Sequence, residues 1–365
     1  MTTGQRWRQL TLTLHAYTKQ ARRKGFYTRK RPAPRNWAAY DQAQLNEMPD
    51  VLDSIRIGVD TASRDLAECL NRLRPGRPRR LDGAADLAKA VLVQQYVGLS
   101  NRIVRGCLRS LSGTLGLVCV PGYKEVERAY SDPDVAVLLL GFFDLTVGAV
   151  RHVRDFSVDG TGLSTSIKDN WERHLAGQRR YGRYAVFEKL VCMVEQTYGV
   201  VAAFRVLDSM HGNESPCLKP LVEEVAGRIG GHDGLHGDGE LGFVCGDSAY
   251  LSRDNCSAVV GLGGVPRFYP KKNSSLRSFG SRAYQEMFLA LIDDPQSWLE
   301  EYHRRYVCES TFSSLKRRCL VPLRREVGCR RKQEVLVRIC VYNLIRLSYA
   351  RWTKNLRTPF RPAPR

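Results

Sequence analysis

Along the first 150 residues, apolar side chains recur every three or four positions, the spacing of helices with one buried face. This pattern predicts a helix over residues 48–73, which ends at the Pro- and Gly-rich linker 74–80. A second helix is expected from residue 86, a third after Ser100, whose hydroxyl can cap it, and a fourth over 123–130. The N-terminal part of the chain is therefore expected to be helical.

Residues 1–40 depart from this pattern. Basic and aromatic side chains are interleaved there, and Pro32 and Pro34 interrupt regular structure. We expect a flexible arm whose basic side chains are suited to contacting phosphate groups.

From residue 150 onward, short runs rich in Val, Phe and Tyr replace the helical spacing. Five strands are expected, over residues 153–159, 185–195, 200–208, 241–245 and 265–269. A helix over 215–229 precedes the fourth strand, and a long helix begins near Pro295. This order of elements predicts an α/β fold in which helices pack on a sheet.

Positive charge is concentrated at the two ends of the chain. The formal net charge of +20 divides into +10 over residues 1–80, +14 over 303–365 and −4 over the residues between them. Such segregation favours a polyanionic partner. Nucleic acid is favoured over a membrane because the basic stretches lack a long apolar face.

The composition excludes several other classes of protein. With 365 residues and 43% hydrophobic side chains, the chain is long and apolar enough for about two folded domains. It has no run of about 18 apolar residues and no apolar leader, so we expect a soluble, cytoplasmic protein. The 11 cysteines are an odd number without a C-x-x-C pair, which favours reduced thiols over disulfides or a zinc site.

A helix, a tight turn and a basic helix follow one another around residues 86–110. The turn contains Gly98 and Ser100, and the second helix carries three basic side chains, those of Arg102, Arg105 and Arg109. A helix-turn-helix that binds DNA needs this arrangement. Plain packing of two helices gives the same pattern, so both interpretations stay open.

Two acidic residues stand where an apolar strand meets glycine. Asp159 precedes Gly160 at the expected end of the first strand, and Asp247 follows Gly246 at the end of the fourth. A carboxylate in such a place can project into an open cleft, although most acidic residues at strand ends only cap turns.

A third acidic residue lies in the polar stripe of the expected terminal helix. At about 100° per residue, four side chains fall within an arc of about 60°, namely Tyr302, Arg305, Glu309 and Lys316. The apolar stripe beside them, Cys308, Phe312 and Leu315, can pack on the sheet and hold the polar stripe at a cleft. The charges alone would also fit a merely solvated face.

The spacing Tyr302–x2–Arg305–x3–Glu309–x6–Lys316 resembles the Tyr-Arg-Glu-Lys signature of DDE transposases from prokaryotic insertion sequences. Residues 159–162, Asp-Gly-Thr-Gly, are similar to the first Asp motif of that family. Residues 246–250, Gly-Asp-Ser-Ala-Tyr, are similar to the second. Each Asp motif is weak by itself, whereas the glutamate signature in the right order is specific.

Two further segments carry the resemblance, which covers about residues 75–350. Residues 270–273 resemble the basic segment after the fifth strand, and 341–344 resemble the Tyr-Asn-Leu ending. The resemblance implies an RNase H-like mixed sheet with flanking helices, preceded by an all-helical DNA-binding region. The expected segments are a basic arm and helical segment (1–80), a helix-turn-helix-like DNA-binding region (81–149), an RNase H-like catalytic domain (150–320), and a basic C-terminal helix and tail (321–365).

By this resemblance, Asp159, Asp247 and Glu309 are catalytic and hold two Mg²⁺ ions, for which Mn²⁺ substitutes. Hard cations prefer carboxylate oxygens, and two of them about 4 Å apart stabilise the attacking and leaving oxygens of phosphodiester cleavage. Water attacks first and the freed 3′-OH then attacks target DNA, so no protein nucleophile is needed. DNA contacts are expected from Tyr302, Arg305, Lys316, Lys271 and Lys272, in addition to the three arginines of the basic helix.

The implied partner is double-stranded DNA, both at the terminal inverted repeats of the element and at the target. A homodimer that pairs two ends is implied as well, and neither a membrane nor a small-molecule substrate is expected. Two alternatives stay open. One is a catalytically inactive DNA-binding protein derived from a transposase, and the other is an RNase H-like nuclease that cuts without joining.

Four other acidic residues lie near these motifs, namely Asp155, Asp208, Glu300 and Glu301. Asp155 can face the same side of its strand as Asp159, but only Asp159 precedes the Gly-rich turn. Glu300 and Glu301 break the Arg-x3-Glu spacing. We expect all four to be surface or capping residues. The short interval between Asp247 and Glu309 also predicts little inserted domain there.

Overall fold

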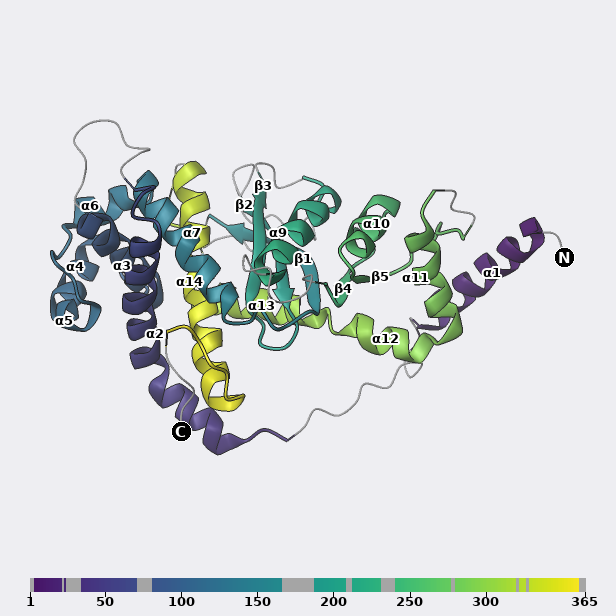
Figure 1. The fold of residues 1–365 in the computed structure, drawn as a ribbon, viewed down its shortest axis with the longest axis horizontal. Coiled ribbons are helices and arrows are strands. Elements are labelled where there is room, and N and C mark those ends of the chain that lie inside the picture. The colour runs from purple at the N-terminus through teal and green to yellow at the C-terminus, as the bar shows by residue number, and fades with distance from the viewer. Residues whose placement is uncertain are drawn as a thin grey trace, which may run out of the picture. The chain divides into compact units, whose positions relative to one another are not determined.

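The structure is a computed structural model that describes residues 3–21, 23, 34–70, 81–165, 187–207, 212–230, 240–276, 280–319, 322–325 and 328–360. The chain forms two units, each built from separated stretches (Figure 1). Unit 1 comprises Met1–Pro34, Arg151–Thr161 and Lys189–Thr311. Unit 2 comprises Arg35–Val150, Gly162–Glu188 and Phe312–Arg365.

A five-stranded mixed sheet confirms the α/β fold expected from residue 150 onward. Its order is β3-β2-β1-β4-β5, with β1 at Phe156–Ser164, β2 at Phe187–Glu195, β3 at Val201–Leu207, β4 at Phe243–Gly246 and β5 at Val265–Phe268. β2 and β3 are antiparallel, whereas β4 is parallel to both β1 and β5. This mixed sheet is consistent with an RNase H-like domain.

The expected end of the first strand at Asp159 is wrong, because β1 continues to Ser164. Thr161 and Leu163 are buried, so the segment beyond Asp159 belongs to the interior rather than to a turn. Gly160 does not mark a turn either. A Cβ atom there would overlap the carboxyl group of Glu214, so the glycine leaves room for that side chain.

The expected flexible arm is wrong for the first 21 residues, because helix α1 (Thr3–Ala21) packs against helix α11 (Arg282–Asp293) within unit 1. Leu14 is fully buried, which gives α1 an apolar anchor. The partner segment is about 260 residues away in the sequence, so local spacing alone could not show this docking. The rest of the expected arm, residues 24–33, lies outside the described residues.

Three more helices of unit 1 pack on the sheet or on each other. Helix α9 (Leu218–Gly230), preceded by the short turn Ser215–Cys217, confirms the helix expected over 215–229 and packs on β3. Helix α10 (Arg253–Gly261) packs on β5, and α12 (Pro295–His303) packs on β4 and β5. Helices α10 and α12 therefore cover the part of the sheet beside Asp247.

The single long helix expected from Pro295 is two helices. Helix α12 ends at His303, and helix α13 begins at Tyr306 and extends to Arg318. The turn between them is tied to the sheet, because the Arg304 carbonyl accepts a hydrogen bond from Ser157 Oγ of β1 at 3.5 Å. Tyr302 and Glu309 therefore do not lie on one continuous helical stripe.

Unit 2 contains the helices expected in the N-terminal part, with different bounds. Helices α2 (Trp37–Asp65), α3 (Leu81–Val97), α7 (Pro133–Gly148) and α14 (Gly328–Thr353) pack against one another (Figure 1). Helix α2 begins before residue 48 because Asn36 caps it, with Oδ1 accepting from Ala39 N at 3.1 Å. The small helices α4 (Asn101–Ser110), α5 (Ser112–Leu115) and α6 (Tyr123–Ala129) complete the group.

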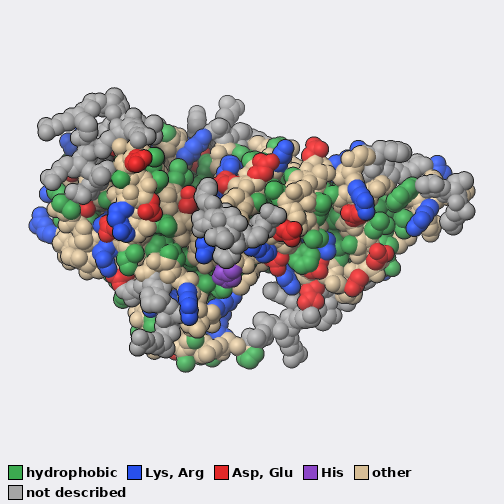
Figure 2. All heavy atoms as spheres, in the orientation of Figure 1, with side chains coloured by type: hydrophobic (Ala, Val, Ile, Leu, Met, Phe, Trp, Pro, Cys, Tyr) green, Lys and Arg blue, Asp and Glu red, His purple; other side chains and the backbone are tan. Residues whose placement is uncertain are grey.

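Charge that is segregated along the sequence is interspersed on the surface. On the face shown in Figure 2, basic and acidic side chains are intermingled. Several basic side chains near the C-terminus form ion pairs within unit 2, such as Arg338 with Glu334 and Arg351 with Asp50. None of the described helices is both long enough and apolar enough to cross a membrane.

Candidate active site

Two of the predicted acidic residues lie next to each other on neighbouring strands. Val158 pairs with Gly246 in the parallel β1–β4 register, so Asp159 and Asp247 are the next residues in line, on strands about 4.8 Å apart. Asp159 Oδ1 accepts a hydrogen bond from the N–H of Gly160 at 2.8 Å. Asp247 Oδ1 accepts one from Ala249 N at 2.7 Å, which fixes the start of the following turn.

Burial raises the pKa of the Asp159 carboxyl to about 6. The Gly160 N–H counteracts this shift, the Asp247 carboxylate adds to it, the Arg305 guanidinium again lowers the pKa, and Glu214 raises it. A buried acid beside two other carboxylates concentrates negative charge where water screens it poorly. Such a place favours a cation and is typical of functional sites.

Arg305 links the third predicted acid to the other two. It lies in the turn between α12 and α13, and its Nη2 is 3.1 Å from Glu309 Oε1. Burial alone would lower the pKa of Arg305, but Tyr302 and the carboxylates of Glu309, Asp159 and Asp247 raise it on balance. Glu309 is thus the ion-pair partner of Arg305, and the charges of Asp159 and Asp247 act on the same guanidinium.

The three carboxylates do not converge on one point. Within the described part of the chain, no three His, Cys, Asp or Glu side chains are arranged to hold a metal ion. Glu309, in the first turn of α13, instead forms its ion pair with Arg305, and its side chain is 48% exposed. The structure thus brings Asp159 and Asp247 together on neighbouring strands, while Glu309 is paired with Arg305.

Tyr302 is more buried than a DNA-contacting side chain was expected to be. It is 7% exposed, its ring stacks on Trp298 with centroids 5.3 Å apart, and it contacts the Tyr269 ring at 5.2 Å. Burial also raises the pKa of its hydroxyl. An unpaired base could not stack on the ring face that Trp298 covers.

The predicted lysines lie in two different places. Lys271 and Lys272 are exposed in the segment after β5, and Lys271 Nζ donates to the Leu251 carbonyl at 3.1 Å. Lys316 lies two turns after Glu309 on α13 and is half-buried, in the part of the helix that belongs to unit 2.

The three arginines predicted to read DNA are exposed on α4 in unit 2. Arg102, Arg105 and Arg109 face outward, whereas Val104 and Leu108 are fully buried. The α3–α4 turn contains the predicted glycine and helix cap. Gly98 has a φ of 70°, and Ser100 Oγ accepts a hydrogen bond from Ile103 N at 3.5 Å.

Two arginines from the segment before α14 hold that turn in place. Arg324 donates to the carbonyls of Gly98 and Leu99, each at 3.1 Å. Arg325 lies over the Tyr130 ring at 3.9 Å from its centroid and donates to Asn101 Oδ1 at 3.0 Å. The local sequence shows none of these contacts, since more than 190 residues separate the partners.

The other acidic residues have structural contacts. Asp155 Oδ1 accepts from Phe243 N at 2.9 Å, and its Oδ2 lies 3.3 Å from Arg304. Glu301 forms an ion pair with Arg267 at 2.6 Å, and Glu300 lies half-buried on α12. Asp208 lies outside the described residues.

One acidic residue near Asp159 was missed by the sequence analysis. Glu214 faces Gly160, lies 2.8 Å from Lys189 Nζ, and accepts a hydrogen bond at 2.8 Å from the hydroxyl of the buried Tyr250. These contacts fix a fourth carboxylate beside the Asp159 strand. No motif marks Glu214, because its partners come from three other parts of the chain.

Comparison with known proteins gives matches over the part of the chain that contains the candidate carboxylates. A family model described as the transposase DDE domain matches residues 154–344, which include Asp159, Asp247 and Glu309. The chain is also 26% identical over 258 residues to the "Probable transposase for insertion sequence element ISA1214" of Archaeoglobus fulgidus. That alignment covers 69% of this chain and 72% of the archaeal protein.

Proposed function

This chain belongs to the transposase DDE domain family, and from that membership we propose that it binds the terminal inverted repeats of an insertion sequence, cuts them and joins them to target DNA. The observation that carries the proposal is the pair of carboxylates, Asp159 and Asp247, side by side on neighbouring strands of the mixed sheet, together with the ion pair of Arg305 and Glu309.

The proposed ligands suit a hard divalent cation. All three are carboxylates, which Mg²⁺ and Mn²⁺ prefer, and Asp159 is buried where uncompensated negative charge is costly. When bound, two such ions would activate the attacking oxygen and stabilise the leaving oxygen of a phosphodiester. Asp159, Asp247 and Glu309 would hold them, and Glu309 would give up its ion pair with Arg305 to do so.

The remaining residues of the signature would bind and orient DNA. Arg305, freed from Glu309, presents a planar guanidinium suited to two phosphate oxygens. Lys316 supplies a point charge further along α13, and Tyr302 supplies a hydroxyl for a phosphate hydrogen bond rather than a stacking surface. Lys271 and Lys272 are proposed to contact the backbone.

Removing divalent metal is expected to stop DNA cutting while binding persists. The purified full chain is incubated with labelled DNA from the flanks of its gene in EDTA and then with added Mg²⁺ or Mn²⁺. Cutting should require metal, because the carboxylates alone neither activate water nor neutralise the leaving oxygen. Equal cutting in EDTA would contradict the proposed site, and binding without metal-dependent cutting would favour the inactive DNA-binding alternative.

We propose that α4 reads the terminal repeats in the major groove. The arginines on α4 are exposed, and an arginine can form a bidentate contact with guanine that is worth about 1–3 kcal/mol of discrimination against a wrong base. Arg105→Ala is therefore expected to weaken binding to the terminal repeat much more than binding to a scrambled duplex.

The matched control for Arg105→Ala is Arg64→Ala, which removes an exposed arginine from α2 of the same unit. Fluorescence anisotropy with both duplexes measures the two affinities. If Arg105→Ala binds the repeat as tightly as the wild-type protein does, the helix-turn-helix proposal is wrong.

Two ends must be cut and joined together, and we therefore propose a homodimer on DNA. A synaptic complex with two protein copies and two ends, seen by light scattering, is the expected species. An RNase H-like nuclease would cut as a one-ended complex and release products without joining them.

A further inference from the structure

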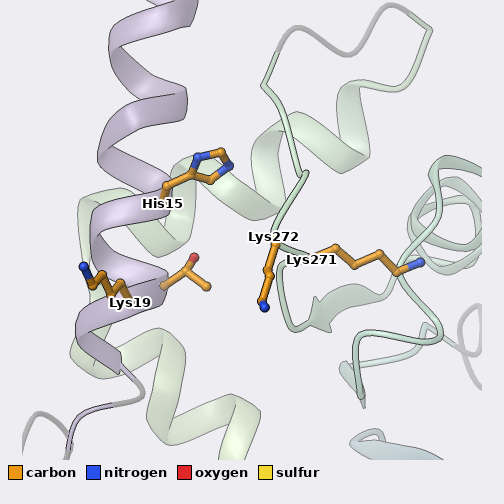
Figure 3. Close-up of a pocket in the computed structure, with 5 residues that line it drawn as sticks. His15, Lys19, Lys271 and Lys272 are labelled. Atoms are coloured by element: carbon orange, nitrogen blue, oxygen red, sulfur yellow. The ribbon is translucent and has the colours of Figure 1, made fainter.

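A basic pocket lies between α1 and the segment that follows β5, all within unit 1. The cavity has a volume of about 270 Å³ and is lined by His15, Thr18, Lys19, Lys271 and Lys272. In Figure 3, His15 and Lys19 come from neighbouring turns of α1, and Lys272 extends into the space beside the helix. Lys271 extends away from α1, toward the Leu251 carbonyl.

The walls of this pocket are held by hydrogen bonds between α1 and the facing segment. The hydroxyl of Tyr269 donates to the Thr18 carbonyl at 3.1 Å, and Leu276 N donates to Thr11 Oγ1 at 3.2 Å. His15 Nε2 lies 2.8 Å from the carbonyl oxygen of Ser274. Lys19 and Lys272 are both exposed. In Figure 3 the Lys272 amine lies in the space beside α1, whereas the Lys19 amine points to the other side of the helix, so Lys19 reaches a ligand in the pocket by turning its long side chain.

The pocket opens near the edge of the sheet that carries the candidate carboxylates. Phe268 pairs with Gly246 in the parallel β4–β5 register, which makes Tyr269 the neighbour of Asp247 in the next row. Neighbouring strands are about 4.8 Å apart. The Tyr269 ring also contacts Tyr302, three residues before Arg305. A DNA strand at the carboxylates therefore lies within reach of Lys272.

We propose that this pocket binds a phosphate group of the DNA backbone, so that α1 forms part of the DNA-binding surface of unit 1. This inference rests on the proposed function. The two exposed lysines supply compact positive charges of the kind that bind phosphate without reading sequence. DNA is favoured over an acidic protein because the pocket follows directly from the strand beside Asp247, where the proposed reaction takes place.

The test is the double variant Lys19→Gln/Lys272→Gln of the full chain. The dissociation constant for a terminal-repeat duplex and for a scrambled duplex is measured across a range of salt concentrations. Each lost phosphate contact lowers the slope of log K against log[salt] by about 1, so a decrease of about 2 is expected on both duplexes. The control Lys219→Gln removes a 66% exposed lysine from α9 of the same unit and should keep the wild-type slope.

A second measurement locates the phosphate. Replacing single phosphates of the terminal repeat by neutral methylphosphonates should reveal one or two positions that weaken wild-type binding and have no effect on the double variant. Lys19→Arg/Lys272→Arg, which keeps both charges, should retain the wild-type slope. An unchanged salt slope in a double variant that unfolds at the wild-type temperature would overturn the proposal. A changed slope would also overturn it if no single methylphosphonate weakened wild-type binding.

Failure of the proposed function gives a different result. A wild-type protein that never cuts DNA, but whose salt slope still depends on Lys19 and Lys272, would contradict the catalytic proposal while supporting the pocket. If the wild-type protein cuts and joins DNA but the double variant keeps the wild-type slope, the catalytic proposal is supported and the pocket proposal is contradicted. Competition by an acidic peptide at the same sites, with no methylphosphonate effect, would assign the pocket to a protein partner instead.

Discussion

Glu309→Gln is expected to abolish DNA cutting and joining while leaving binding to the terminal repeats nearly intact. The amide has the same shape as the carboxylate but lacks the negative charge that a divalent cation requires. Losing several kcal/mol of charge stabilisation slows the reaction at least about 10³-fold, because each 1.36 kcal/mol is a factor of ten. The proposed phosphate contacts of Lys271 and Lys272 are untouched, so affinity should persist.

The chain offers a matched control for this variant. Glu286 on α11 forms an i,i+4 ion pair with Arg282, as Glu309 does with Arg305, and its side chain is 52% exposed. Glu286→Gln therefore removes an equivalent surface charge from a different helix, and it should cut DNA at the wild-type rate. Wild-type cutting by Glu309→Gln would show that the metal-ligand assignment is wrong.

Glu334→Ala is expected to destabilise the protein by about 3–5 kcal/mol, because it leaves a buried arginine without its carboxylate. Glu334 is fully buried on α14 and pairs at 2.6 Å with Arg338, whose side chain is only 3% exposed. The same carboxylate accepts hydrogen bonds from the backbone N–H groups of Arg324 and Arg325. Denaturant unfolding of the full chain measures the loss.

This variant should also impair DNA reading, since Arg324 and Arg325 hold the turn that precedes α4. Specific binding to the terminal repeat should therefore fall even when it is measured without denaturant, at a temperature at which the variant is still folded. The control is Glu127→Ala, which removes a half-exposed partner of Arg330 at 3.8 Å in the same unit. Such a surface pair contributes about 0–1 kcal/mol. Equal stability of the two variants would contradict the role assigned to Glu334.

Much of the sheet and of the site could be predicted because the relevant signals are local. Apolar runs such as residues 190–194, which are fully buried in β2, mark strands by composition alone. The Tyr-Arg-Glu-Lys spacing marks Glu309 as a candidate without any knowledge of the fold, and its role as a ligand stays a prediction. Asp159 and Asp247 stood out because both adjoin glycine at an apolar strand, and the parallel pairing of β1 and β4 does bring them together.

The features that were wrong or missed depend on contacts between distant parts of the chain. The docking of α1 rests on bonds such as that between His15 and Ser274, 259 residues apart. Glu214 became visible only when the fold placed it against Gly160. The break between α12 and α13 lies where Arg304 is hydrogen-bonded to Ser157 of β1, and no helix-breaking residue marks it in the sequence.

The most direct test of the central claim is to sequence the products that the full chain makes from DNA carrying the flanks of its gene, target DNA and Mg²⁺. The account predicts cuts at defined element ends and junctions of those ends with target DNA, both absent with Glu309→Gln. Binding of the ends by the wild-type protein without cuts or junctions, or the same products from both proteins, would contradict it.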